Sequence, residues 1–311
     1  MGSGSWTRAA YATYCCSTGK TYNATTDCIN ENYTSTAQAF KSCKLNEALD
    51  PKNVIRECCD SKEHPESLPI ILALDVTGSM GDTAIRIQKL LNPIMTKIYE
   101  EVKDAEIAIM AIGDLACDDA PIQMSQFESD IRIADNLDKI YFERGGGGNT
   151  WESYTAAWYM GLKHTKLDCW KRSRKGIIIT MGDERLNPYL PLDGYSCGLR
   201  AATGDSLQAD VETKKLYKEA KEKFDMFHIC VESGCYPDQR NNLKTFQDVM
   251  GEKRAIISSV DDIKDNIIKA IKYYAKKNTP SILVEDTSCD DATAKPEVDK
   301  PEVDNPEEIS W

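Results

Sequence analysis

The chain of 311 residues carries a formal net charge of −12 and 41% hydrophobic residues, a composition typical of a globular protein with a sizeable core. Most of the charge lies in residues 285–311, where ten acidic residues and two lysines contribute −8. No cluster of Lys and Arg predicts a nucleic-acid-binding face, and no apolar run reaches the roughly 18 residues of a membrane span. We therefore expect neither nucleic acid nor a bilayer as partner.

The N-terminal sequence and the cysteines bear on the cellular compartment. The first residues, MGSGSWTRAAY, lack the charged and apolar regions of a secretory signal, so we expect a cytoplasmic protein. Six of the twelve cysteines lie in the first 60 residues, but four of these form two adjacent pairs and none belongs to a Cys-x-x-Cys motif. Reduced thiols packed as small apolar side chains are the favoured interpretation, with disulfides or a metal left open.

Residues 1–66 form a polar, Thr-, Asn- and Cys-rich N-terminal extension with weak periodicity. Segments 35–49 and 51–59 are its best candidates for short helices. The extension is too short and too polar to predict an independent domain, so we expect it to pack on the residues that follow.

Residues 67–280 alternate between strand and helix patterns. Strands are predicted at 68–76, 104–114, 122–127, 175–184, 224–232 and 254–259, and helices at 82–102, 130–140, from about 149, 206–223, from about 237, and 260–277. The third strand forms a hairpin with the second, and residues 186–205 form a long loop. This order predicts an α/β fold with a doubly wound, mostly parallel six-stranded sheet and one antiparallel edge strand, whose ligands bind at the carboxyl ends of the strands.

The C-terminal residues 281–311 contain the repeat KPEVDKPEVDNPEE. Prolines at five-residue intervals with acids between them cannot form a core or a long helix. This tail is predicted to be disordered.

Oxygen-bearing side chains follow two of the predicted strands. Asp75, Thr77 and Ser79 stand at alternate positions in DVTGS, although a turn alone would need only Gly78 and one Asn or Asp. Asp183 ends the strand IIITMGDE. Three hard donors at one strand end indicate a bound ligand.

A glycine-rich segment, ERGGGGNTWES, precedes the helix predicted from about residue 149. Asn149 or Thr150 is expected at the N-cap of this helix, and Glu152 in its first turn.

The motif DVTGS resembles the Asp-x-Ser/Thr-x-Ser signature of von Willebrand factor A (vWA) domains, the metal-ion-dependent adhesion site. The segments GGGGNTWES and IIITMGDE stand in the order of that family's second and third metal-binding loops, and the resemblance covers about residues 67–277. It implies a vWA fold with metal ligands from all three loops. These are Asp75, Thr77 and Ser79 from the first loop, Thr150 or Asn149 from the second, and Asp183 from the third.

The third loop departs from the usual Thr-Asp-Gly, because Asp183 follows Thr180 by three residues. This is similar to the variant found beside alpha-kinases and in bacterial and phage-encoded proteins, which implies a bacterial or phage source. The second loop is similar to the same variants, in which Asn149 stands for the usual Thr and Glu152 is an additional candidate; Thr150 remains the favoured ligand.

The resemblance implies a non-enzymatic, metal-dependent protein-binding module. Mg²⁺ or Mn²⁺ would be held by neutral hydroxyls, with Asp75 and Asp183 acting through water, so that one position stays open for an acidic side chain of a partner. Some intracellular relatives act with AAA+ ATPases, which makes an AAA+ ATPase or a phage component a candidate partner and extends the expected location to the virion.

Two other classes of function stay open at this point. A metal-dependent hydrolase or phosphoryl-transfer enzyme would need a general base, for which Glu152, Glu184 and the Asp118–Asp119 pair are the candidates. A phage structural or assembly protein with a degenerate site would bind no cation and would assemble through apolar contacts.

Overall fold

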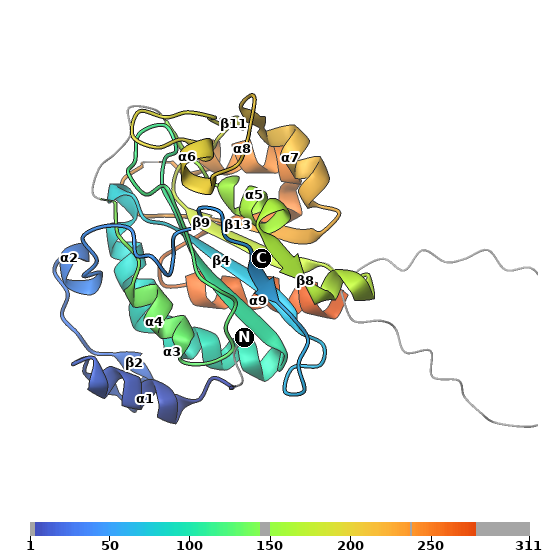
Figure 1. The fold of residues 1–311 in the computed structure, drawn as a ribbon. Coiled ribbons are helices and arrows are strands. Elements are labelled where there is room, and N and C mark those ends of the chain that lie inside the picture. The colour runs from blue at the N-terminus through green and yellow to red at the C-terminus, as the bar shows by residue number, and fades with distance from the viewer. Residues whose placement is uncertain (1–3, 144–149, 237, 278–311) are drawn as a thin grey trace, which may run out of the picture.

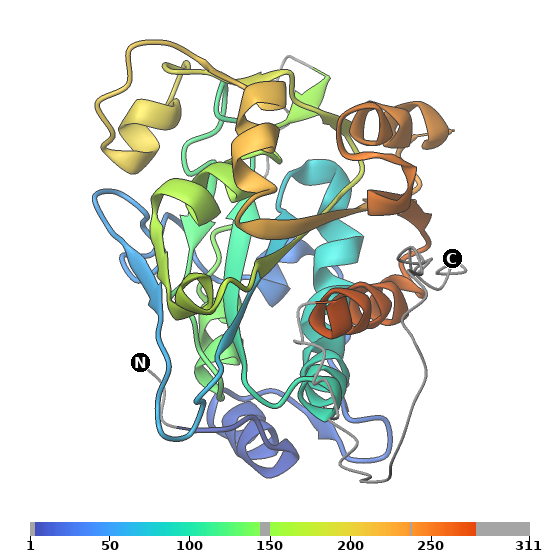
Figure 2. The same ribbon diagram turned by 90° about the vertical axis from the view of Figure 1, so that its right-hand side faces the viewer.

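The computed structural model describes residues 4–143, 150–236 and 238–277, and it is built on a six-stranded sheet with the order β14-β13-β9-β4-β5-β6 (Figures 1 and 2). Its strands are β4 (Leu68–Asp75), β5 (Ala105–Ile112), β6 (Ile122–Met124), β9 (Gly176–Gly182), β13 (Phe224–Val231) and β14 (Ala255–Ser258). All neighbours are parallel except β5 and β6, which are antiparallel. The predicted mostly parallel sheet with one antiparallel edge strand is confirmed.

Helices cover both faces of the sheet (Figure 1). Helices α3 (Gly81–Glu101), α4 (Arg132–Asp138) and α9 (Ile263–Lys277) pack on one face, and α5 (Ala156–Lys163), α7 (Thr213–Ala220) and α8 (Arg240–Met250) on the other. Alternate residues of β4 explain the two cores, since Ile70, Leu72 and Leu74 join the first and Ile71 and Ala73 the second. Burial on both faces accounts for the nearly unbroken apolar runs of the central strands.

The N-terminal extension packs against α3 and α4 as far as Leu49. Its elements are α1 (Arg8–Ser17), β1 (Tyr22–Asn23), β2 (Cys28–Ile29), α2 (Thr36–Ala39) and β3 (Arg56–Cys58). The indole N–H of Trp6 donates to Asn92 Oδ1 at 2.9 Å, and the Tyr14 hydroxyl donates to Asp138 Oδ2 at 2.6 Å. The extension therefore shares a core with the helices that follow it.

Two predictions for this extension were wrong. The helix expected over 35–49 spans only α2, and the one expected over 51–59 is replaced by strand β3. Strand β3 pairs in parallel with β8 (Thr165–Leu167), so a tertiary backbone contact decides the conformation there. Helix α1 was not predicted; Thr7 caps it by accepting a hydrogen bond from the Ala10 N–H at 3.1 Å.

The predicted starts of two helices were also wrong. Helix α5 begins at Ala156, because residues 151–152 form strand β7 (Trp151–Glu152), which pairs with β10 (Arg185–Leu186). Glu152 is thus a strand residue, Thr150 does not cap a helix, and Asn149 lies outside the described residues. Helix α7 begins at Thr213 instead of residue 206, since β12 (Val211–Glu212) pairs with β11 (Tyr189–Leu190).

The loop predicted over 186–205 contains β11 and α6 (Leu199–Thr203). In the described ranges, none of the helices combines the length and the apolar character that crossing a bilayer would require. The eleven cysteines of these ranges are free thiols. Residues 281–311 lie outside the described part of the chain, so their disorder stays a prediction.

Candidate metal centre

The candidate site lies where β4 and β9 end. Asp75 is the last residue of β4, and Asp183 directly follows β9. These strands are parallel neighbours, with Leu74 opposite Met181, so their carboxyl ends lie side by side. After Asp75 the chain turns through the short 3₁₀ segment Gly78–Met80 into α3. The structure thereby places the DVTGS oxygens next to Asp183.

The hydroxyls of the motif donate their protons to the two aspartates. Asp75 Oδ1 accepts from the Thr77 backbone N–H at 2.9 Å and from the Thr77 hydroxyl at 2.6 Å. The Ser79 hydroxyl donates to Asp183 Oδ1 at 2.9 Å. A hydroxyl has one proton and two lone pairs, so both oxygens keep lone pairs for a cation.

The two carboxylates carry charge that the described residues do not balance. Asp75 and Asp183 are both 0% exposed, and within the described ranges neither forms an ion pair with a Lys, Arg or His. Burial, together with the charge of Asp183, raises the pKa of Asp75 to about 7, and burial raises the pKa of Asp183. A bound divalent cation would relieve both costs, so these residues fit the cation that the resemblance implies.

Two further side chains complete the hydrogen bonds of these aspartates. The Tyr154 hydroxyl donates to Asp75 Oδ2 at 2.6 Å and accepts from the Glu184 N–H at 3.1 Å. The Ser233 hydroxyl donates to Asp183 Oδ2 at 2.5 Å. The sequence analysis missed both. Ser233 could have been found, because it follows β13 at the same edge of the sheet, whereas Tyr154 had no such signal.

Tyr154 is fully buried, and the backbone of β9 is adapted to it. A Cβ atom at Gly182 would lie 2.2 Å from the Tyr154 hydroxyl oxygen, so only glycine fits there. The Tyr154 ring packs against His228 and Phe246 with centroid distances of 5.2 and 5.5 Å. His228 is itself buried, and burial lowers its pKa well below the usual range, so this histidine is a neutral core residue.

The second loop contributes differently from the prediction. Thr150 is exposed and directly precedes β7, and Asn149 is not among the described residues. Glu152, at the end of β7, is only 6% exposed. Its pKa is raised to about 11 by burial and by neighbouring carboxylates, of which Asp75 has the largest effect. Glu152 is therefore the described residue of this loop whose pKa the charge of Asp75 raises.

The chemistry of the donor set favours a hard cation. Across the described ranges, no group of three or more His, Cys, Asp and Glu side chains is arranged to hold a metal ion. A cation at the strand ends would therefore depend on hydroxyls and water in addition to carboxylates. Mg²⁺ accepts such a set, since it keeps several waters and takes few carboxylates.

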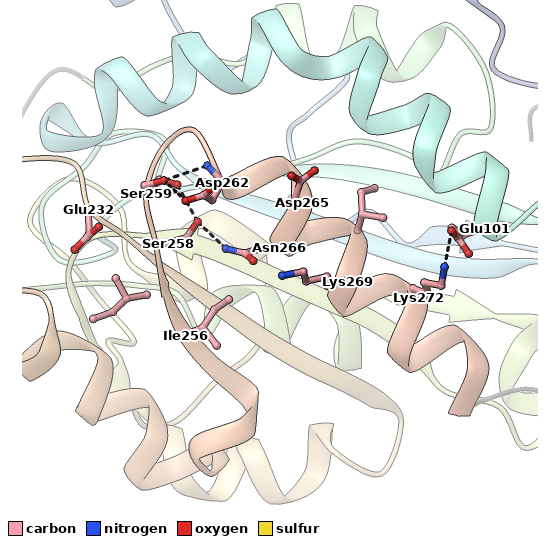
Figure 3. A pocket seen from close by; sticks show the side chains of 12 residues that line it. Glu101, Glu232, Ile256, Ser258, Ser259, Asp262, Asp265, Asn266, Lys269 and Lys272 are labelled. Atoms are coloured by element: carbon pink, nitrogen blue, oxygen red, sulfur yellow. Dashed lines mark hydrogen bonds and ion pairs between the residues drawn. The ribbon is translucent and has the colours of Figure 1, made fainter. Parts of the chain in front are cut away.

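A cleft of about 700 Å³ lies apart from these residues, between edge strand β14 and α9 (Figure 3). Some of its polar groups pair with one another: Lys272 pairs with Glu101 at 2.9 Å, and Asn266 donates to the Ser258 hydroxyl at 2.9 Å. None of the predicted metal ligands lines it. The cleft is therefore separate from the predicted cation site.

The candidate general bases come from three segments of the chain, and Asp118 and Glu184 both raise the pKa of Glu152. Asp118 is buried, which raises its pKa to about 6, and its Oδ2 accepts from the Asp114 N–H at 2.7 Å. Asp119 is exposed, and Glu184 accepts a hydrogen bond from the Tyr236 hydroxyl. Asp118 and Glu184 thus already have hydrogen-bond donors.

Comparisons with known proteins give similarity in structure but not in sequence. No protein-family model and no curated protein matches the chain. Similar solved structures include the pilus adhesin SpaC from Lactobacillus rhamnosus GG in its open conformation, with 13% identity and a TM-score of 0.44 over 71% of this chain. A second form of SpaC has 13% identity and a TM-score of 0.48 over 69% of this chain. The chain spans 31% of the SpaC chain in both. The vWF domain of the type V pili tip protein Mfa5 from Porphyromonas gingivalis is also similar (12%, TM-score 0.45), with 70% of this chain and 98% of that one covered.

Proposed function

We propose that this chain is a non-enzymatic, metal-dependent protein-binding module of the vWA type. In this proposal Asp75, Thr77, Ser79 and Asp183 hold Mg²⁺ or Mn²⁺, with Thr150 or Asn149 from the second loop. The observation that carries it is the pair of buried aspartates at adjacent strand ends, each bonded to a hydroxyl of the DVTGS motif and neither balanced by a cationic side chain in the described ranges.

The charge balance of this site suits the recruitment of an anion. Two aspartates neutralise a divalent cation, while the hydroxyls add none of the negative charge that would weaken its attraction for a further ligand. A carboxylate of a partner protein is a hard oxygen ligand for the open position. The partner is therefore a protein that presents an accessible Asp or Glu.

The loops around the strand ends offer an aromatic contact for such a partner. The loop after β5 is hydrogen-bonded to the second loop, since the Ser153 N–H donates to the Gly113 carbonyl at 3.1 Å. The same loop also holds Tyr195, whose N–H donates to the Ala116 carbonyl at 2.7 Å. The Tyr195 side chain is 95% exposed. Exposed tyrosines are frequent anchors of protein interfaces, so Tyr195 belongs to the proposed binding face.

Calorimetric titration of Mg²⁺ and Mn²⁺ tests the proposal, with and without free glutamate as the carboxylate probe. The wild-type chain should bind both cations and should bind glutamate only when a cation is present. Asp75→Ala should lose cation binding by about a hundredfold or more, because it removes one of two balancing charges.

Asp261→Ala is the matched control, because Asp261 is an exposed aspartate that pairs with Arg86 at 3.1 Å. This variant should bind cations like the wild type. A wild-type chain that binds neither cation would refute the proposal, and so would an Asp75→Ala chain that binds both with unchanged affinity.

A further inference from the structure

A hollow of about 270 Å³ opens at the edge of the sheet where the parallel strands begin. It is lined by Leu68, the first residue of β4, by residues just before β5, and by the last turn of α9. The candidate metal centre lies at the other end of β4, eight residues or about 26 Å away. The hollow is therefore a separate site.

The basic residues that line this hollow outnumber the acidic ones. Its three acidic residues already have basic partners, in the pairs Glu66–Arg174 at 2.8 Å, Glu101–Lys272 at 2.9 Å (Figure 3) and Asp104–His64 at 3.6 Å. Lys103 and Lys276 also line it; both are exposed, and neither forms an ion pair within the described ranges. The hollow therefore offers two positive charges to an acidic ligand.

Apolar side chains line the hollow as well. Leu68 is 3% exposed, and Val102 and Ala275 are partly buried and pack against the first core. A site that combines apolar contacts with a few charged groups binds ligands of the same mixed character. The lining thus suits a short peptide segment in which apolar residues stand next to acids.

The chain itself supplies such a segment directly after this hollow. Two of the lining residues belong to the last turn of α9, which ends at Lys277. The first apolar run after α9 is Ile-Leu-Val at 282–284, and Glu285 and Asp286 follow it. The five residues from Lys277 to the start of this run span at most about 17 Å. The tether therefore keeps the segment near the hollow at a high effective concentration.

We infer that residues 282–286 occupy this hollow in their own chain. Their apolar side chains cover Leu68 and its apolar neighbours, and Glu285 and Asp286 pair with Lys103 and Lys276. Two carboxylates thereby meet the two lysines that lack an ion pair within the described ranges.

The docked segment determines where the rest of the acidic tail leaves the folded domain. Residues 287–311 start from the edge of the sheet that is remote from the candidate metal centre. Their carboxylates are directed away from a site at which they would compete with a partner protein. The docking itself involves no cation, so it does not rest on the proposed function.

Digestion of the full chain with thermolysin tests the inference, because this protease cleaves before Ile, Leu and Val and needs a released segment. Lys103→Glu together with Lys276→Glu makes both attractive contacts repulsive, so cleavage at 282–284 should be about tenfold faster than in the wild type. Lys214→Glu together with Lys215→Glu is the matched control. Both lysines are exposed, lie in the first turn of α7 on the other face of the sheet, and give the same change in net charge. This control should be cleaved at the wild-type rate.

A charge-swapped chain separates docking from a disturbed fold. Adding Glu285→Lys and Asp286→Lys to the chain with Lys103→Glu and Lys276→Glu restores two ion pairs of opposite polarity. Cleavage at 282–284 should then slow towards the wild-type rate, whereas a general loss of stability would not be reversed by changes in the tail.

Three results would overturn the inference. The first is wild-type cleavage as fast as that of a free peptide of residues 278–311, and the second is an unchanged rate in the chain with Lys103→Glu and Lys276→Glu. The third is protection that increases with protein concentration, which would assign the hollow to the tail of a second copy. Cation binding is measured independently by calorimetry, so this inference and the proposed function can fail separately.

Discussion

Buried aspartates occur at both ends of the parallel sheet, and the chain treats them differently. Asp225, near the start of β13, is 1% exposed and is paired with Arg254 at 3.2 Å and Lys277 at 3.7 Å. Asp75, at the end of β4, is 0% exposed and receives only neutral donors, from Thr77 and Tyr154. At one end the chain provides the cation itself, whereas at the other no Lys, Arg or His of the described ranges pairs with the aspartate.

This difference separates a structural carboxylate from a candidate binding site. A buried ion pair fixes its partners, because removing one of them leaves an uncompensated charge. Two buried carboxylates without a cationic side chain instead destabilise the folded chain, and an external cation that binds them removes this destabilisation. Burial is the same at both ends, so the counter-charge is the informative quantity.

The largest expected effect on stability comes from removing the internal cation. Arg254→Met keeps the apolar stem of the side chain but removes the closer of the two cations that pair with Asp225, and we expect it to lower the free energy of unfolding by roughly 3 kcal/mol. Urea denaturation measures this change. Cation binding at the other end should be unaffected.

Arg240→Met is the control for this prediction, since Arg240 is 82% exposed and pairs with Asp238. It should leave the urea midpoint unchanged, because exposed ion pairs contribute little. Equal effects of the two substitutions would mean that Asp225 does not depend on its counter-charge, and the comparison between the two ends would lose its basis.

A smaller effect is expected from the neutral donors of Asp75. Tyr154→Phe keeps the ring that fills the space at Gly182 but removes the hydroxyl that bonds both Asp75 and the Glu184 N–H. We expect a loss of about 1–2 kcal/mol in the free energy of unfolding, measured in urea with EDTA present.

Tyr159→Phe is a matched control for Tyr154→Phe, because the Tyr159 hydroxyl donates a single hydrogen bond, at 2.5 Å, to the partly exposed Asp205. It should cost less than Tyr154→Phe. The reverse order would show that the Tyr154 hydroxyl contributes little to holding Asp75.

The central sheet could be predicted because its strands are buried on both faces. Eight consecutive residues of β4 and eight of β5 are buried. Such runs can be recognised in the sequence without any knowledge of the tertiary structure. The same reasoning placed Asp75 and Asp183 at the carboxyl ends of parallel strands, where the structure brings them together. Sequence analysis can therefore predict the positions of side chains that follow from the order of the strands.

The remaining features depend on tertiary contacts that leave little periodic signal. Strand β7 has two residues and exists only because it pairs with β10. A Gly-rich segment before an apolar stretch predicted a helix start instead, which misplaced Glu152 in a first helical turn. Residues 51–59 carry apolar side chains at helical spacing, yet pairing with β8 makes part of them a strand. Tyr154 reaches Asp75 from 79 positions away in the sequence.

The smallest predicted effect is a gain in stability when the charge of Asp75 is removed. It tests directly whether the two aspartates at the carboxyl ends of the strands destabilise the folded chain. Asp75→Asn can still accept the hydrogen bonds of Thr77 through its amide oxygen, and it removes the repulsion between Asp75 and Asp183. Against this gain stands the Tyr154 hydroxyl, which must find a new acceptor. We expect a net increase of roughly 1 kcal/mol in the free energy of unfolding with EDTA present, since sites organised for ligands sacrifice stability.

With Mg²⁺ present the order of Asp75→Asn and the wild type should reverse, because only the wild type gains from the cation by mass action. Urea denaturation of both chains with EDTA and with Mg²⁺ gives all four values, and Asp261→Asn, at an exposed aspartate, controls for the substitution itself. If Asp75→Asn is less stable than the wild type under both conditions, the carboxylate of Asp75 is a structural element like that of Asp225. The counter-charge would then fail as a criterion for separating the two ends of the sheet.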